Sequence, residues 1–508
     1  MADQRIEQPS AGAGGSAETP RPEWRYFADL LGLSSLAIAQ PILSTFAADP
    51  AAFVTARAGS FEVIAFALIV VLVPPAASWV VELLVALVSR PLRRWLHLVA
   101  LATLVALFFQ AFVAGPLGAL LAIAAAVGAA YAFARSETAR TFLGYLAFAP
   151  LLFLAIFFLS PVSRLVFGSE PQAEAIEAPA DLPPVVMAVF DELPLSSLLD
   201  GEGNIDADAF PNFAALAEDA TFARNNTSVS PSTPFAVPPL STGIQPSRDV
   251  PLPSYVQHPE SLFTLLGGEY TMYSSEHVTQ LCPESLCEVP TGEGSTRDAA
   301  LVSLLKAAAK IPFGGQIFFD IGIDGLDPVV QVDWITDGIE AADDEPTLHY
   351  LHSMLPHQDW IYLPDGELHD GPNPPPGLGA GYISESAADA TGVKQRHMLQ
   401  LAYADELLGQ ILDSLRESGR YEDSLIVVTS DHGVAFEPGE PTRYLSEASH
   451  RDIMWTPLLV KAPQQQEPAV VDSPTTSVDV LPTIIDVLGI DTDWELDGQS
   501  ILGPPREE

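Results

Sequence analysis

Long apolar runs dominate the first third of the chain. Five of them lie between residues 27 and 161, and each has close to or more than the ~20 residues that a helix needs to cross a bilayer. The first run is the most polar and can alternatively lie at the membrane interface. We therefore predict a tail over residues 1–26 and a membrane domain over residues 27–161 with about five transmembrane helices. The runs are Phe27–Phe46, Phe61–Val88, Leu96–Ala114, Pro116–Ala134 and Phe142–Ser160.

Shorter apolar runs follow a predicted linker over residues 162–184, which is rich in Pro, Ala and Glu from Ser169 onward. Val185–Phe190 and Leu425–Ser430 are continuous apolar runs, typical of strands that are buried on both faces of a parallel sheet. Strands that alternate with amphipathic helices predict a layered α/β domain over residues 185–508. The expected helices are Pro211–Ala220, Val393–Ser418 and Asp479–Leu488. One short strand is expected to begin at His349 and run into a loop, and another is expected over Leu458–Val460.

Charge separates the two parts of the chain. The whole chain has a net charge of −42, but residues 1–168 contain 10 Arg, no Lys and 9 acidic residues, so −43 remains for residues 169–508. Such a charge excludes a nucleic-acid-binding protein that works by neutralising phosphates, and it argues against a polybasic lipid-binding surface. Because the chain has only four Lys, we also predict adaptation to salt, with an anionic substrate repelled at low ionic strength.

Arginines in the short connections predict the orientation in the membrane. Only Arg57 and Arg164 lie near the opposite side, so the side with eight Arg is expected to face the cytoplasm. Five crossings from a cytoplasmic N-terminus place the domain after Ser160 outside the cytoplasm. The eight residues are Arg5, Arg21, Arg25, Arg90, Arg93, Arg94, Arg135 and Arg140.

Two pairs of polar residues complete this picture. Glu62 and Glu82 of the second run would be about 30 Å apart on a helix, so they cannot pair and are expected near opposite interfaces. Cys282 and Cys287 lie in the domain expected outside the cytoplasm, where oxidation is permitted, so a local disulfide is favoured over free thiols.

Acidic residues and a histidine follow the two predicted parallel strands. Asp191 and Glu192 come after the first strand, and Asp431 and His432 come after the second. Ligands of open α/β sheets bind beyond the carboxyl ends of the strands, so these side chains are expected to share one site. Asp191, Asp431 and His432 are the best metal ligands, and oxygens with one imidazole suit Zn²⁺, Mn²⁺ or Mg²⁺. The segment Thr227–Gly243 supplies hydroxyls for a nucleophile, or is simply a Ser/Thr/Pro-rich loop.

Five pieces follow one another in the soluble domain: the strand before Asp191, Leu240–Gly243, Ser430–Gly433, Thr456–Pro463 and Ser477–Ile484. In this order they resemble the sulfatase branch of the alkaline phosphatase superfamily, and the likeness spans nearly the whole soluble domain. With the membrane part, the layout is similar to membrane-bound sulfatase-like enzymes, including lipoteichoic acid synthases and phosphoethanolamine transferases. The resemblance implies an alkaline-phosphatase-like layered α/β sulfatase domain behind a multi-span helical membrane domain.

Residue roles follow from this resemblance. It implies that Asp191, Asp431 and His432 bind a divalent metal, and that Thr233, ten residues before Gly243, is the nucleophile and also contacts the metal. Pro238 matches the transferase members, which also use Thr, whereas the formylglycine motif of classical sulfatases is absent here. This departure moves weight from sulfate hydrolysis to phosphoester chemistry. Ser232 and Ser230 are weaker alternatives for the nucleophile.

Histidines are the remaining candidates. The resemblance implies that His357 contacts substrate or protonates the leaving group, and His450 is expected to do the same or to bind a second metal. Glu192 is expected to support the ligands, while His349, His352 and Asp405 are expected to be structural.

We therefore predict an integral membrane enzyme with a Thr nucleophile and a divalent metal. It would hydrolyse or transfer phosphate or sulfate esters outside the cytoplasm, on a lipid or an envelope glycan. The alternative is a non-catalytic sulfatase-fold protein that binds an envelope partner; a transporter is disfavoured because the apolar runs contain few polar residues. Hydrolase against transferase, the ester class, and the identity and number of metals stay open.

Overall fold

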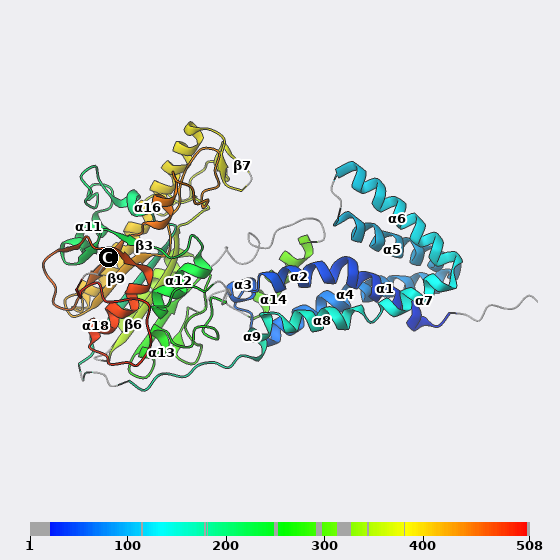
Figure 1. Cartoon of the computed structure of the whole chain (residues 1–508), viewed down its shortest axis with the longest axis horizontal. Coiled ribbons are helices and arrows are strands. Elements are labelled where there is room, and N and C mark those ends of the chain that lie inside the picture. Colours follow the sequence, from blue (N-terminus) through cyan, green and yellow to red (C-terminus); the bar gives the residue numbers. More distant parts are fainter. Residues whose placement is uncertain are drawn as a thin grey trace, which may run out of the picture. The chain divides into compact units, whose positions relative to one another are not determined.

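The computed structural model describes residues 21–112, 115–176, 179, 181–247, 252–290, 297–311, 327–342, 345–379 and 381–504. The chain forms two compact units, one made of Met1–Leu43 and Ala67–Ile156, the other of Ser44–Phe66 and Phe157–Glu508. Figure 1 labels their elements.

Five helices in the described residues are long and apolar enough to cross a membrane, matching the number of predicted runs. They extend over Glu23–Ala48, Ser60–Val88, Arg90–Gln110, Gly115–Arg135 and Glu137–Leu159. Their elements are α1 (Glu23–Ser34), η1 (Ser35–Ala39), α2 (Gln40–Ala48), α4 (Ser60–Val88), α5 (Arg90–Gln110), α6 (Gly115–Arg135), α7 (Glu137–Leu146) and α8 (Ala149–Leu159), with the short α3 (Ala51–Thr55) between α2 and α4.

Proline explains the two irregular helices. The π-helical turn η1 ends two residues before Pro41, which has no N–H to donate to the carbonyl of the preceding turn. In the last run, α7 ends at Leu146 and α8 begins at Ala149, beside Pro150. The polar positions that made the first run the weakest of the five therefore coincide with a widened turn, while the helix itself continues.

A buried polar network lies within the first unit. Glu82 is only 1% exposed, and its Oε1 is 2.9 Å from His97 Nδ1. The other ring nitrogen of His97 is 3.3 Å from Asp29 Oδ2, and Arg21 forms a 2.5 Å ion pair with the same oxygen. Glu82 thus has a partner on another helix, His97 of α5, which the prediction of a residue near an interface did not include.

The second unit is built on an eight-stranded sheet of order β11-β2-β10-β9-β1-β6-β4-β5. The central strand β1 is parallel to both neighbours, β6 and β9, and β4 is parallel to β6, whereas β10 runs antiparallel to β9. The strands are β1 (Val185–Asp191), β2 (Thr221–Ala223), β4 (Thr271–Ser275), β5 (Cys287–Glu288), β6 (Thr347–Pro356), β9 (Leu425–Ser430), β10 (Leu458–Lys461) and β11 (Ala469–Val471).

Helices cover both faces of this sheet (Figure 1). Successive side chains of β1 point to opposite faces, so they pack against different helices. Val186, Ala188 and Phe190 join a core with the helices α10, α11, α15 and α16. Val185, Met187 and Val189 join a second core with α12, α13 and α18. Both faces of the strand are therefore buried, which explains its unbroken apolar run.

The helices of this unit differ from the predictions mainly in length. The longest, α16, begins six residues before the expected Val393, and α12 forms within the segment predicted as a loop, although Pro238 and Pro239 lie inside it. Part of the predicted linker is helical because Val162 and Val166 are buried in α9. The helices are α9 (Val162–Phe167), α10 (Leu195–Leu198), α11 (Pro211–Glu218), α12 (Thr233–Thr242), α13 (Leu262–Leu266), α14 (Arg297–Lys310), α15 (Pro328–Ala341), α16 (Ala387–Glu417), α17 (His450–Met454), η3 (Ser477–Asp479) and α18 (Val480–Leu488).

Two small sheets and one disulfide complete the unit. The predicted bond between Cys282 and Cys287 is present, with a Cα–Cα distance of 6.1 Å. The predicted fold class, a helical N-terminal part followed by a layered α/β domain, is confirmed. The small sheets pair β3 (Asn226–Thr227) with β12 (Thr475–Thr476), and β7 (Leu378–Gly379) with β8 (Ile383–Ser384).

Candidate active site

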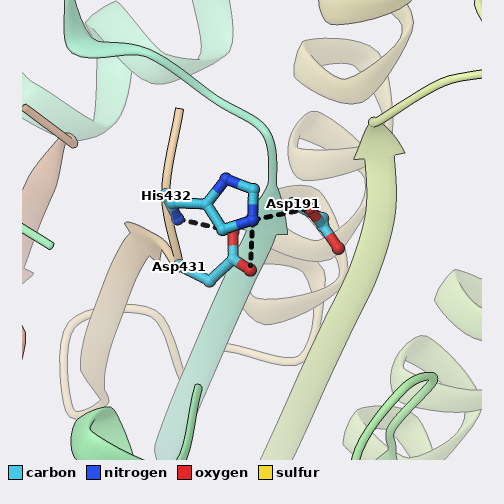
Figure 2. A group of neighbouring side chains, drawn as sticks. All are labelled: Asp191, Asp431 and His432. Carbon is cyan, nitrogen blue, oxygen red and sulfur yellow. Dashed lines mark hydrogen bonds and ion pairs between the residues drawn. The ribbon is translucent and has the colours of Figure 1, made fainter. Parts of the chain in front are cut away.

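The carboxyl ends of three adjacent strands bring together the polar residues that the sequence placed after them. Asp191 is the last residue of β1, Asp431 and His432 follow β9, and His357 follows β6. Because β9, β1 and β6 are parallel neighbours, these ends meet at one edge of the sheet. Figure 2 shows the ring of His432 between the carboxylates of Asp191 and Asp431.

The predicted ligand group has the composition and spacing of a divalent metal site. His432 Nε2 is 3.9 Å from Asp191 Oδ1 and 3.6 Å from Asp431 Oδ2, and one ligand atom from each residue lies within 4.8 Å of the others. Within the described residues, these two carboxylate oxygens are buried and accept no hydrogen bond. Buried carboxylate oxygens are costly without a partner, so the residues present fit a divalent cation.

Electrostatics support the same interpretation. Burial and the neighbouring Asp431 raise the pKa of Asp191 to about 8, and burial raises the pKa of Asp431 to about 7. Burial and the charge of Arg443 lower the pKa of His432 to about 3, so this imidazole is neutral and can act as a ligand. A bound cation would relieve the repulsion between the two carboxylates.

Thr233 is the hydroxyl residue that lies at this group. Its Oγ1 donates to Asp191 Oδ2 at 3.1 Å and is 3.4 Å from His432 Nε2. Thr233 is the first residue of α12 and only 3% exposed. The positive end of the helix dipole favours negative charge there, which suits a hydroxyl oxygen that must become a nucleophile.

The alternative nucleophiles have other contacts. The hydroxyl of Ser230 lies near the backbone of Ser232, accepting from Ser232 N at 3.2 Å, while Ser232 itself is the N-cap residue of α12. Ser228 donates to Asp431 O at 2.5 Å. These serines shape the loop that leads into Thr233, and the geometry favours Thr233 among the hydroxyls of this segment.

Arg443 is a cation of the site that sequence reasoning missed. Its Nε donates to Glu192 Oε1 at 2.5 Å, and its Nη2 is buried with no hydrogen-bond partner in the described part of the chain. Against the effect of burial, Arg443 lowers the pKa of Glu192 to about 2, so the two form an ion pair beside Asp191. Glu192 thus supports the site, as expected. No pattern in the sequence marks Arg443, and its place in the site follows from its tertiary contact with Glu192.

The two catalytic histidine candidates lie in different surroundings. His357 is 8% exposed, its Nδ1 contacts Gln358 O, and it directly follows Pro356, the partner of Asp191 in the register of β1 and β6. His450 is exposed at the start of α17, where its Nδ1 contacts Glu447 O. The structure therefore brings His357 to the site, whereas the predicted catalytic role of His450 finds no support in its contacts.

Of the three residues expected to be structural, His352 differs. Asp405 accepts hydrogen bonds from the backbone of Asn212 and Phe213 at the start of α11, and His349 contacts Thr347, as structural residues do. The fully buried His352 instead lies with Nε2 4.0 Å from Asp191 Oδ2, and neither ring nitrogen has a hydrogen-bond partner among the described residues. It points to the opposite face of β6 from His349, because the two residues are three positions apart and side chains alternate between the faces of a strand.

Comparison with known proteins identifies a family. The family model described as Sulfatase matches residues 202–490. Among curated proteins, the chain is 32% identical over 106 residues to arylsulfatase K of Bos taurus, covering 21% of this chain and 19% of that protein. It is 24% identical over 200 residues to a lipoteichoic acid synthase of Staphylococcus saprophyticus, covering 35% and 28%. The chain thus spans less than a third of the length of these relatives.

Two further similarities complete the comparison. The multifunctional alkaline phosphatase superfamily protein PehA of Trinickia caryophylli is 33% identical over 100 residues, covering 19% of each chain. Among solved structures, a phosphonate monoester hydrolase of Agrobacterium radiobacter superposes with a TM-score of 0.44 at 17% identity, covering 63% of this chain and 76% of that one.

Proposed function

Because this chain belongs to the sulfatase family, we propose that it is a membrane-anchored, metal-dependent enzyme that hydrolyses or transfers phosphate or sulfate esters with Thr233 as nucleophile. One observation carries this proposal: the hydroxyl of Thr233 lies against both Asp191 and His432, at the group that fits a divalent cation. Similarity to an arylsulfatase favours a sulfate ester, and similarity to a lipoteichoic acid synthase favours an ester on a lipid or a glycan.

Asp191, Asp431 and His432 would hold the metal, which when bound makes a nearby hydroxyl more acidic and draws charge from the ester oxygens. The hydrogen bond from Thr233 to Asp191 orients the Oγ1 lone pairs. Oγ1 gives its proton to the carboxylate of Asp191 and forms a bond to phosphorus or sulfur while the bond to the leaving oxygen breaks, and a covalent Thr233 ester results.

The other side chains act on the ester and the leaving group. His357 supplies a proton to the leaving oxygen, and the ion-paired Arg443 offers an N–H group to the ester oxygens. Water or an acceptor hydroxyl then attacks the covalent ester and gives its proton to His357, while the bond to Thr233 Oγ1 breaks and Oγ1 takes its proton back from Asp191. Water gives a hydrolase and an acceptor hydroxyl gives a transferase.

Three features support an anchored domain outside the cytoplasm. The five long apolar helices provide the anchor, and the arginines in their short connections favour a cytoplasmic N-terminus. The disulfide between Cys282 and Cys287 fits an oxidising compartment.

The test uses the full chain in detergent, with Mn²⁺ or Zn²⁺ supplied and metal content measured. Chromogenic phosphate monoester, phosphate diester and sulfate ester are offered to the parent, to Thr233→Ala and to Ser232→Ala as the matched control. We expect turnover of one ester class that is lost in Thr233→Ala, retained in Ser232→Ala, and dependent on the metal.

Loss of turnover in Ser232→Ala with retention in Thr233→Ala would show that Ser232, and not Thr233, is the nucleophile. An absence of turnover for every class, together with an absence of bound metal, would favour a binding protein that has kept the sulfatase fold.

A further inference from the structure

The longest helix of the second unit holds two segments of the site through one of its faces. Gln400 and His397 are three residues apart on α16, and both are fully buried. Residues three apart on a helix lie on the same face. This face of α16 therefore meets the segments that carry Glu192 and His357.

Gln400 makes hydrogen bonds to the backbone on both sides of a turn. Its Nε2 donates to His357 O at 2.5 Å, and its Oε1 accepts from Ile361 N at 3.0 Å and from Tyr362 N at 3.3 Å. One side chain thus satisfies three backbone groups of the segment that begins at His357. Buried backbone groups without partners are costly, so the segment has a strong preference for this position.

His397 holds the neighbouring segment. Its Nε2 donates to Glu192 O at 3.0 Å, at a residue with a φ of 59°, a conformation that non-glycine residues rarely adopt. Glu192 in turn accepts from Gln358 N at 3.3 Å, and Gln358 O contacts His357 Nδ1. The peptide beside His357 is therefore held by Glu192, while the carbonyl of His357 itself is held by Gln400.

From this arrangement we propose that Gln400 is a positioning residue that directs the imidazole of His357 at the leaving group of the ester. The carbonyl of Gln358 engages Nδ1, so Nε2 is the nitrogen left to exchange a proton with a substrate. Gln400 fixes the backbone from which that imidazole projects. The inference rests on the proposed function, since it requires His357 to act on the leaving group.

A proton donor matters most when the leaving group is strongly basic, and this gives a test that a purely structural residue would not pass. The full chain in detergent, supplied with metal, is offered aryl esters whose phenols have increasing pKa. The variants are His357→Ala, Gln400→Met and Gln400→Asn, with Gln410→Met as the control at an exposed glutamine of the same helix. Metal content and melting temperature are measured for each.

We expect Gln400→Met to lower kcat/KM about a hundredfold for the most basic phenols and less than about threefold for the least basic. His357→Ala should show the same trend more strongly, and Gln410→Met should follow the parent. Gln400→Asn keeps an amide on a shorter side chain and should recover part of the loss. If the methionine variant does not fold, the asparagine variant carries the test, with a smaller change of the same kind.

The outcomes distinguish a failure of the positioning role of Gln400 from a failure of the proposed role of His357. A steeper dependence on phenol pKa in His357→Ala, with an equal loss for all esters in both Gln400 variants, would overturn the positioning role and leave the proposed function standing. No change of this dependence in His357→Ala would remove His357 as the proton donor, and the inference about Gln400 would fall with it.

Discussion

At the scale of single residues, Arg443 shows how charge is arranged beside the ligands. Its guanidinium is held by Glu192 through Nε, which leaves Nη2 for an anionic oxygen. A lysine would keep the charge but lose the planar fork that engages two partners at once. The pairing therefore supplies both position and charge to the site.

We predict that Arg443→Lys lowers kcat/KM by about ten- to a hundredfold, because the ammonium cannot contact Glu192 and the ester oxygens with the same geometry. Steady-state kinetics with the ester class that the parent turns over provide the measurement, and Arg451→Lys, at an exposed arginine of α17, is the control. An unchanged kcat/KM in Arg443→Lys would show that Nη2 does not contact the ester.

His349 allows a pH-dependent prediction away from the ligands. Burial lowers its pKa to about 3, so it stays neutral in the folded protein while it takes up a proton in the unfolded chain below about pH 6.5. Its contribution to stability is complete above that pH and is lost progressively as the pH falls toward 3. Between about pH 7 and about pH 5, the parent should lose about 2 kcal/mol of stability that His349→Gln does not lose.

Denaturant unfolding of both proteins at the two pH values measures this difference directly. His450→Gln, at an exposed histidine, controls for general effects of removing an imidazole. Equal losses in the parent and in His349→Gln would mean that His349 takes up its proton in the folded state.

At the scale of elements, the buried network of the first unit joins three helices. His97 of α5 contacts Glu82 of α4 on one side and Asp29 of α1 on the other. Removal of one member of a buried ionic group leaves the others without compensation, which typically costs about 3–5 kcal/mol. We predict that His97→Ala lowers the melting temperature of the full chain in detergent and exposes α1 to protease.

Thr103→Ala on the same helix is the control, since its exposed hydroxyl donates to the Val99 carbonyl of its own helix. The double variant His97→Gln with Glu82→Gln removes charge and keeps hydrogen-bonding atoms, so it should be less damaging than His97→Ala. Equal melting temperatures for His97→Ala and Thr103→Ala would show that the network contributes nothing to the assembly of these helices.

The elements also show what could be predicted from the sequence. Apolar runs that end in acidic residues marked β1 and β9, and spacing to Gly243 marked Thr233, so four residues that meet in the structure were predicted together. The position of His352 near Asp191 could not be, because it depends on the register of β6 against β1, which no sequence pattern indicates. Arg443 and Gln400 required tertiary contacts, since their own segments contain no distinguishing pattern.

At the scale of the whole molecule, charge opposes the chemistry that the site is proposed to perform. The −43 of residues 169–508 repels an anionic ester before it reaches Arg443. Screening acts over about 10 Å at 0.1 M salt and about 3 Å at 1 M, so added salt removes long-range repulsion while it leaves contacts inside the site largely intact.

We therefore predict that KM for an anionic ester falls as salt rises from low to molar concentration, while kcat changes little. Initial rates of the full chain over a range of NaCl concentrations measure both constants, and an ionic-strength series with a second monovalent salt separates screening from specific ion effects. A matched comparison with Arg443→Lys locates the effect, because both proteins share the same long-range field and should show the same relative fall in KM. A KM that instead rises monotonically with salt would mean that attraction by Arg443 and the metal outweighs the acidic surface, and that the surface charge serves another purpose.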